Sequence, residues 1–271
     1  MTTFDLGAYR RQITTASDTA RKAFDDGLIW IFGFNHEMAA QCFATAIAAD
    51  PDCAMAHWGL AYAIGPNYNR PWEFMQRDEQ AAMLRQGWAA IHAAQAVSSR
   101  IAAVEAALVD ALAARFPESP EIESFAPYND AFAAAMREVY KAFPCDLDVV
   151  CIFAEALINR TPWQLWDQKT DAPREGSDAL EALEVLDGLF ETVPEAWDHP
   201  GLLHIYIHVV AMSPFPEKAL RHGERLVDLV PESGHLVHMA THIDLVCGEY
   251  QNVVTRNRRA AIIDRKYAAL A

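Results

Sequence analysis

Proline, glycine and aspartate divide this sequence into segments of helical length, and this punctuation constrains the fold more than any other feature. Between the breaks the segments are rich in alanine, and they show no convincing alternation of apolar and polar residues with a period of two. The clearest breaks are Asp50-Pro51, Pro194, Pro214-Phe215-Pro216 and Pro231. The pattern predicts an all-α fold that forms a single domain over residues 1–271.

Small and aromatic residues recur at fixed distances in the first quarter of the chain. The set comprises Ala39, Phe43, Pro51, Trp58, Gly59 and Tyr62. Glycine and alanine permit two helices to cross closely, and aromatic rings fill the space beside them. This spacing resembles the tetratricopeptide repeat (TPR), and weaker copies occur towards the C-terminal end. The resemblance implies a TPR-like right-handed α-solenoid of about six helix pairs.

Charge and hydropathy exclude several classes of function. The formal net charge is −15, whereas a nucleic-acid-binding face needs clustered cations, so we exclude nucleic acid as the main partner. We find no basic amphipathic stretch for a membrane surface and no apolar run approaching the ~18 residues that span a bilayer. The N-terminal segment lacks the apolar core of a signal peptide. The five cysteines are scattered, so we expect a cytoplasmic protein with reduced thiols.

Histidines give the strongest functional signal, because seven of the ten fall between positions 199 and 242. His204 and His208 are four residues apart, and His235, His238 and His242 follow a spacing of three and then four. These steps return to nearly the same face of an α-helix. We expect the two rows on helices over residues 199–212 and 233–246, which are adjacent first helices of successive pairs. The rows would then converge on one or two metal ions.

A cation resolves the difficulty of packing imidazoles together. Neutral rings leave donors and acceptors unsatisfied, and protonated rings repel one another. A lone helical histidine, in contrast, is usually a surface residue or a hydrogen-bonded core residue, and we interpret His92, His199 and His222 in this way. An all-imidazole set without thiolates suits transition metals rather than Mg²⁺ or Ca²⁺. Copper and iron are the metals we expect, with zinc as the alternative.

Further candidates lie far from these rows in the sequence. A solenoid of this length makes most of a superhelical turn, so His36 is expected as a ligand from the opposite end. His57 and Glu37 are weaker candidates, the alternatives being a hydrogen-bonded core histidine and a helix first-turn acid. Glu155 and Asn159 share a helical face and either line the groove or are solvated. Two loops that follow helices would either bind a small-molecule substrate or pack onto the helices. Their candidate residues are Asn67, Asn69, Trp163 and Trp166.

Four segments carry a wider resemblance. They are FNHEMAAQCFATAIAADPDCAMAHWGLAYAIGPNYN, AEALINRTPWQLWD, HPGLLHIYIHVVAMSPFPEKAL and GHLVHMATHIDLVCGEY. Together they resemble a family of bacterial TPR-like proteins of poorly defined function, whose histidine segments read HxxIH and GHLxHMxxHI. The resemblance implies the fold and the importance of His36 and the two histidine rows, but no reaction. Ala211 stands where the family usually has an acid, Ala240-Thr241 stands where it has Pro-Ser, and family members are much longer.

These patterns lead to three hypotheses. The first is a metal-dependent oxidoreductase that acts with dioxygen on a small molecule enclosed by the solenoid. Its copper or non-haem iron centre has one or two ions. The ligands would be His204, His208, His238 and His242, with His235 and His36 in addition. The second is a non-catalytic TPR-type module that binds a peptide or protein partner on the solenoid surface. The third is a zinc-dependent hydrolase.

Overall fold

The computed structural model describes residues 4–119 and 121–269, and their regular secondary structure is almost entirely helical. The all-α prediction is confirmed. None of the described helices is both long and apolar enough to cross a membrane. The chain divides into two compact units, each described by itself. The N-terminal unit is Arg10–Trp163, and the C-terminal unit is the remainder. The single domain over residues 1–271 stays a prediction.

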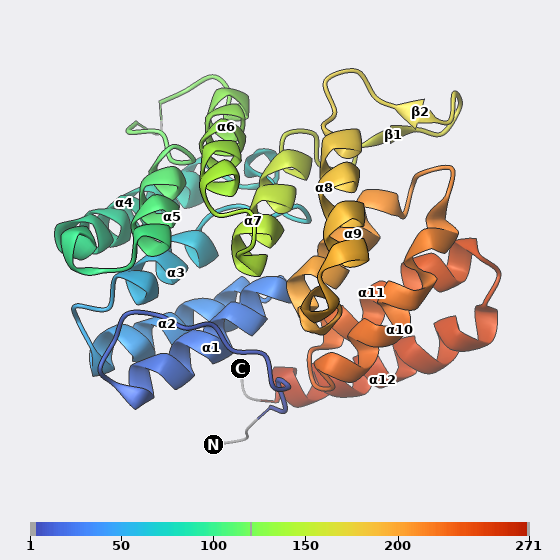
Figure 1. The fold of residues 1–271 in the computed structure, drawn as a ribbon, viewed down its shortest axis with the longest axis horizontal. Coiled ribbons are helices and arrows are strands. Elements are labelled where there is room, and N and C mark those ends of the chain that lie inside the picture. The colour runs from blue at the N-terminus through green and yellow to red at the C-terminus, as the bar shows by residue number, and fades with distance from the viewer. Residues whose placement is uncertain (1–3, 120, 270–271) are drawn as a thin grey trace. The chain divides into compact units, whose positions relative to one another are not determined.

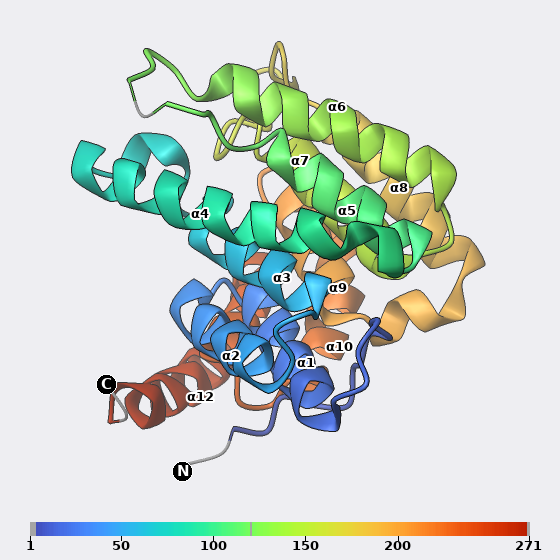
Figure 2. The ribbon, with the colours of Figure 1, turned by 90° about the vertical axis from the view of Figure 1, so that its left-hand side faces the viewer.

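The N-terminal unit is a succession of helices in which each packs against the next. The helices are α1 (Asp18–Phe32), α2 (His36–Ala49), α3 (Ala54–Ile64), α4 (Arg77–Val97), α5 (Ala103–Ala113), α6 (Ala126–Ala142) and α7 (Leu147–Ile158). Two short 3₁₀ helices cover Trp72–Phe74 and Ser98–Arg100. In addition, α3 contacts both α1 and α5. Figures 1 and 2 show these helices from two directions.

Phe43 explains how the first three helices pack so closely. Its ring, from α2, is fully buried, and it lies against Gly27 of α1 and Gly59 of α3. A Cβ added at Gly27 would lie 2.8 Å from Cε1 of Phe43, and one added at Gly59 would lie closer still. The contact between small and aromatic residues that the repeat spacing indicates is therefore present at this crossing.

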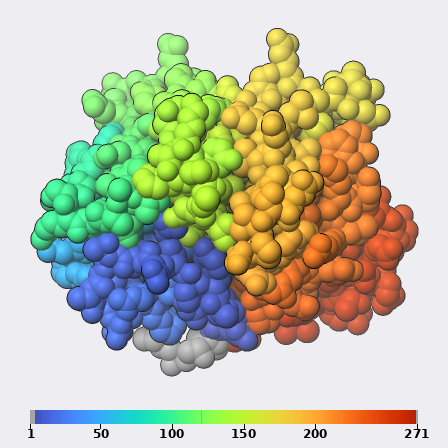
Figure 3. Space-filling view, in the orientation of Figure 1, coloured from blue at the N-terminus to red at the C-terminus, as the bar shows by residue number. Residues whose placement is uncertain are grey.

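The C-terminal unit contains five further helices and a short two-stranded ribbon. The helices are α8 (Ala179–Thr192), α9 (Pro200–Val210), α10 (Leu220–Leu229), α11 (Gly234–Val246) and α12 (Tyr250–Ala268), with 3₁₀ turns over Pro194–Asp198 and Pro216–Ala219. The antiparallel strands are β1 (Trp166–Asp167) and β2 (Ala172–Pro173), and Trp166 pairs with Pro173. Two residues are too few to show alternation, so the sequence did not reveal these strands. Residues 164–177, which carry the ribbon, form part of the surface in Figure 3.

The two helices that carry the histidine rows lie side by side. Helix α9 contacts α10 and α11, and α11 contacts α12. Pro200 occupies the first position of α9, where no backbone donor is needed, and the Nδ1 atom of His199 accepts a hydrogen bond from the amide of Leu202 (3.1 Å). All residues of α9 are buried. The helices expected over 199–212 and 233–246 are thus confirmed, within two residues at each end.

Candidate metal centre

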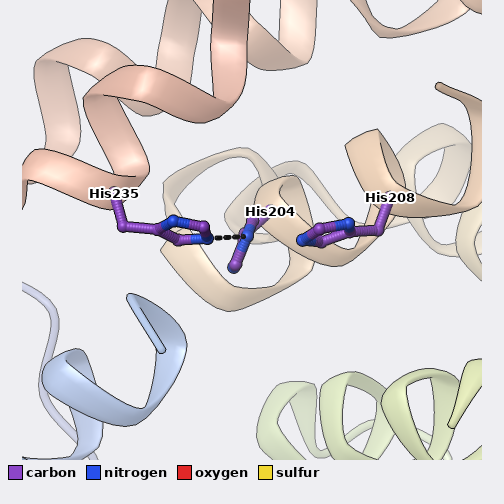
Figure 4. Close-up of side chains that lie close together, drawn as sticks. All are labelled: His204, His208 and His235. Atoms are coloured by element: carbon purple, nitrogen blue, oxygen red, sulfur yellow. Dashed lines mark hydrogen bonds between the residues drawn. The ribbon is translucent and has the colours of Figure 1, made fainter. Parts of the chain in front are cut away.

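Three histidines from α9 and α11 form a group that could hold a metal ion. Each of His204, His208 and His235 offers one nitrogen atom, and these atoms all lie within 4.8 Å of one another. The Nε2 atoms of His235 and His204 are 3.1 Å apart. Figure 4 shows the ring of His204 between the rings of the other two. No carboxylate or thiolate of the described residues belongs to the group, so the ligand set is wholly imidazole.

Burial keeps two of these rings neutral. Loss of hydration lowers the pKa of His208 well below 6.5, and positive charge on His235 and His242 acts in the same direction. The pKa of His235 is also lowered well below 6.5, first by burial and then by the neighbouring histidines. His204 itself has no solvent exposure. Because a neutral imidazole has a lone pair available, a metal ion need not compete with a proton for these ligands.

His238 and His242 form a second pair on α11. Their Nε2 atoms are 3.1 Å apart. Charge on His242 and His238 helps to lower the pKa of His235, after burial and the charge of His204. The pair is therefore electrostatically coupled to the first group, although it lies outside it. All five histidines of the two rows lie in the C-terminal unit. They form a group of three and a separate pair, rather than a single set of five ligands.

Asn257 of α12 orients this second pair. The hydroxyl of Thr241 donates to the carbonyl of His238 (2.7 Å), so its oxygen accepts from Nδ2 of Asn257 (3.3 Å). The amide oxygen of Asn257 therefore faces Nδ1 of His238 (2.7 Å), which must be the donor. This tautomer leaves the lone pair of His238 on Nε2, the atom that faces His242. A carbonyl oxygen behind a ring nitrogen is the usual support of a metal-bound histidine.

The remaining predicted ligands belong to the N-terminal unit. Nε2 of His36 is buried without a hydrogen-bond partner among the described residues. Burial, followed by the charge of Arg115, lowers the pKa of His36 to about 4. Glu37 is exposed in the first turn of α2. His57 makes a hydrogen bond through Nε2 to the carbonyl of Pro51 (2.9 Å), close to the start of its own helix. Ligation by these three residues stays a prediction.

The four candidate substrate-binding residues have different environments. The side-chain oxygen of Asn67 accepts from the amides of Asn69 (3.0 Å) and Arg70 (2.9 Å), so it stabilises its own turn. Oδ1 of Asn69 is buried without a partner among the described residues. Trp163 is 43% exposed. Trp166 is buried in the C-terminal unit, and Nε1 donates to the carbonyl of Val209 (2.7 Å). Trp166 thus packs its loop onto α9, and its role in substrate binding stays a prediction.

The lone histidines are core or surface residues, as expected. His199 caps α9, and His222 is buried with its ring stacked on Tyr206 (centroids 3.8 Å apart). His92 is exposed beside Trp88. The sequence did not indicate Asn257, because it lies in the basic segment TRNRRA, where a single amide has no distinguishing pattern. Thr241 stood between two predicted ligands and could have been suspected from that position alone.

Comparison with known proteins adds no assignment. The chain matches no model of a protein family, and no curated protein is found to be similar to it. The functional interpretation therefore depends on the histidine geometry.

Proposed function

We propose that this chain is a metal-dependent oxidoreductase that acts with dioxygen on a small molecule. The observation that supports the proposal best is the group formed by His204, His208 and His235, whose nitrogen atoms lie within 4.8 Å of one another. Imidazole nitrogen is a preferred ligand of copper and non-haem iron, and the group has no carboxylate of the kind that Mg²⁺ or Ca²⁺ requires. The residues therefore fit a copper or iron ion.

The second pair supports a centre of two ions. His238 and His242 lie next to the first group on the same helix, and Asn257 fixes the lone pair of His238 on the nitrogen that faces His242. Two sets of three histidines would suit a dinuclear copper centre; these residues provide three imidazoles for one ion and two for a second. Copper or iron, when bound, would supply the electron transfer that couples reduction of dioxygen to oxidation of the substrate.

The protein residues supply the environment for this chemistry. The depressed pKa values of His208 and His235 keep their rings ready to ligate at neutral pH. The complete burial of His204 excludes bulk water from one side of the group. The proposed scaffold is a TPR-like α-solenoid of about six helix pairs, and it is supported by the way α9 packs against both α10 and α11.

A zinc-dependent hydrolase is the second candidate, because three imidazoles with an open fourth position also suit a zinc-bound water. Metalloproteases with an HExxH motif place a glutamate directly after the first histidine as general base. Here Ile205 follows His204 and Met239 follows His238. The absence of this glutamate leaves the hydrolase without an identified base, so we prefer the oxidoreductase.

Metal analysis of the purified protein tests the proposal. The protein is loaded separately with Cu(I), Fe(II) and Zn(II), passed over a desalting column and analysed by elemental mass spectrometry. We expect copper or iron to be retained at one or two ions per chain, and to be lost in His204→Ala and His235→Ala. His92→Ala is the matched control, since this exposed histidine lies in the other unit.

The metal that is retained decides between the hypotheses. Copper or iron that consumes dioxygen in the presence of ascorbate, measured with an oxygen electrode, supports the oxidoreductase. Retention of zinc alone favours hydrolysis. Absence of all three metals after loading excludes both enzymes and leaves the peptide-binding module.

A further inference from the structure

The guanidinium group of Arg115 is buried in the N-terminal unit and makes no hydrogen bond with the described residues. The side chain is 1% exposed, and none of its three guanidinium nitrogens has a partner among the described residues. A guanidinium is charged at every physiological pH and carries five N–H donors. Burial of such a group without acceptors costs several kcal/mol, so nearly all buried charges in proteins are paired. Packing within the fold therefore does not explain why the charge of Arg115 is buried without a hydrogen-bond partner in the described part of the chain.

Aromatic rings hold the guanidinium group in place. Its central carbon lies over the ring of Tyr62 at 5.4 Å and over the ring of Phe132 at 5.0 Å. A guanidinium contacts an aromatic ring through its face, whereas its hydrogen bonds are donated in its own plane. These ring contacts therefore fix the position of Arg115 and leave its donors unused. A planar cation fixed in this way matches a carboxylate, which accepts two parallel hydrogen bonds.

Glu155 is a buried acid that interacts electrostatically with Arg115, but its oxygens accept hydrogen bonds from other residues. One of its oxygens accepts from the hydroxyl of Tyr62 (2.7 Å), and the other accepts from Nδ2 of Asn159 (3.3 Å). Burial raises the pKa of Glu155, while the charge of Arg115 lowers it, so the two groups interact at a distance without a hydrogen bond. Both Glu155 and Asn159 are buried rather than solvated. The charge of Arg115 is thus not neutralised by direct contact.

Other polar atoms of the N-terminal unit are also buried and unpartnered among the described residues. Oδ1 of Asn159 and Nε1 of Trp72 are both buried without a partner among residues 4–119 and 121–269. Asn159 is joined to the Tyr62–Glu155 pair, and Tyr62 is one of the rings beneath Arg115. An isolated unsatisfied atom has many explanations, but two unsatisfied groups linked through Tyr62 and Glu155 indicate that a polar occupant is missing.

We propose that Arg115 binds the carboxylate of a small organic acid. The single cation and the nearby Glu155 favour a monocarboxylate over a phosphate, which carries more charge. The rings of Tyr62 and Phe132 favour an apolar or aromatic body. Since the nitrogens of Arg115 are covered in the structure, binding moves neighbouring side chains aside. This site lies within the N-terminal unit and does not depend on the metal centre.

Calorimetric titration of the metal-free protein tests the site with matched pairs of compounds. The compounds are benzoate and propionate, their neutral amides benzamide and propionamide, and inorganic phosphate. We expect benzoate to bind more tightly than propionate, and both amides to bind at least about tenfold more weakly, because an amide lacks the charge that pairs with arginine. Hydrogen exchange should show benzoate-dependent protection of the backbone around residues 108–116.

Substitutions separate recognition from a structural role. Arg115→Met and Arg115→Lys should each weaken benzoate binding about tenfold or more, since lysine cannot offer a planar pair of donors. Arg100→Met is the control, because that arginine is 62% exposed. Arg115→Met should be at least as resistant to urea as the parent protein, because it removes a buried, unpaired charge.

Three results would overturn the proposal. The first is that the acids and their amides bind equally well, or that none of these compounds binds. The second is tighter binding of phosphate than of either carboxylate. The third is a large loss of stability in Arg115→Met without loss of benzoate binding, which would identify Arg115 as a structural counter-charge to Glu155. If that variant does not fold, the exchange experiment on the parent protein still decides, because a structural role predicts no protection by benzoate.

Discussion

His204 and His235 meet through their Nε2 atoms at 3.1 Å, although 31 positions separate them in the sequence. In the absence of a metal one ring must donate to the other, so only one of the two nitrogens carries a lone pair, and that lone pair accepts the hydrogen bond. A metal ion would replace this single hydrogen bond with two stronger ligand bonds. Without metal, the two rings are joined by this one hydrogen bond. We therefore expect a bound metal ion to strengthen the link between α9 and α11.

Metal binding should stabilise the folded protein. At a free metal concentration of 100 times Kd, a ligand that binds only the folded state adds about 2.7 kcal/mol to the free energy of unfolding. We expect thermal unfolding of the copper-loaded protein to occur at a higher temperature than that of the chelator-treated protein. In His204→Ala the two transitions should coincide. An equal rise in the variant and the parent would place the metal elsewhere.

Asn257 should matter for metal affinity rather than for folding alone. Asn257→Leu removes the acceptor that holds His238 in the tautomer with its lone pair on Nε2. Loss of such a supporting hydrogen bond typically lowers metal affinity about tenfold to a hundredfold. Competition with a chelator of known affinity measures the change. Gln251→Leu, at an exposed position of the same helix, is the control. Equal affinities in the two variants would remove Asn257 from the centre.

The histidine rows could be predicted because their positions depend on helical periodicity. Spacings of three and four residues fix which side chains share a face of α9 and of α11, and proline and glycine fix where the helices end. The division into three plus two could not be predicted. It depends on the rotation of each helix about its axis, which is set by packing, and on Asn257 from α12, a helix with no histidine pattern.

Arg115 shows a second limit of the sequence. It follows the alanine-rich helix α5 in the segment ALAARFPE, where an arginine normally indicates an exposed helix end. Its burial results from contacts with Tyr62 and Phe132, which lie on other helices. Long-range packing of this kind leaves no trace in local spacing. In contrast, the close crossing at Phe43 and Gly59 was indicated by the regular spacing of small and aromatic residues along the chain.

His222 should make the stability of the protein depend on pH. Burial lowers the pKa of His222 from 6.5 to about 4. Between these values the unfolded chain takes up a proton that the folded protein refuses, so stability is present above pH 6.5 and is lost as the pH falls towards 4. The shift corresponds to at most about 3 kcal/mol, since one pKa unit is worth about 1.4 kcal/mol.

The variant His222→Phe isolates this contribution. Phenylalanine keeps an aromatic ring against Tyr206, whose centroid lies 3.8 Å from that of His222, but it cannot be protonated. Urea unfolding of metal-free protein at several pH values should therefore show a smaller fall in stability below pH 6.5 in the variant than in the parent. His208, His235 and His242, whose pKa values are also lowered, act in both proteins and cancel in the comparison. Parallel curves for the two proteins would show that His222 does not titrate as we infer.

Gly59→Ala should destabilise the N-terminal unit by overpacking. The new methyl group would collide with the ring of Phe43, which Gly27 confines from the side of α1. Because the ring is fully buried it cannot turn into solvent, and the helices must move apart, at a cost of about 1–3 kcal/mol. The free energy of urea unfolding measures this cost.

Gly188→Ala in α8 is the control, since no atom lies within 4 Å of its added Cβ. Alanine there should instead stabilise the helix, by up to about 1 kcal/mol. The double variant Gly59→Ala with Phe43→Leu should recover part of the loss, because the smaller side chain vacates the space that the methyl group takes. If Gly59→Ala proved as stable as the parent, the close crossing of α2 and α3 would not depend on this glycine.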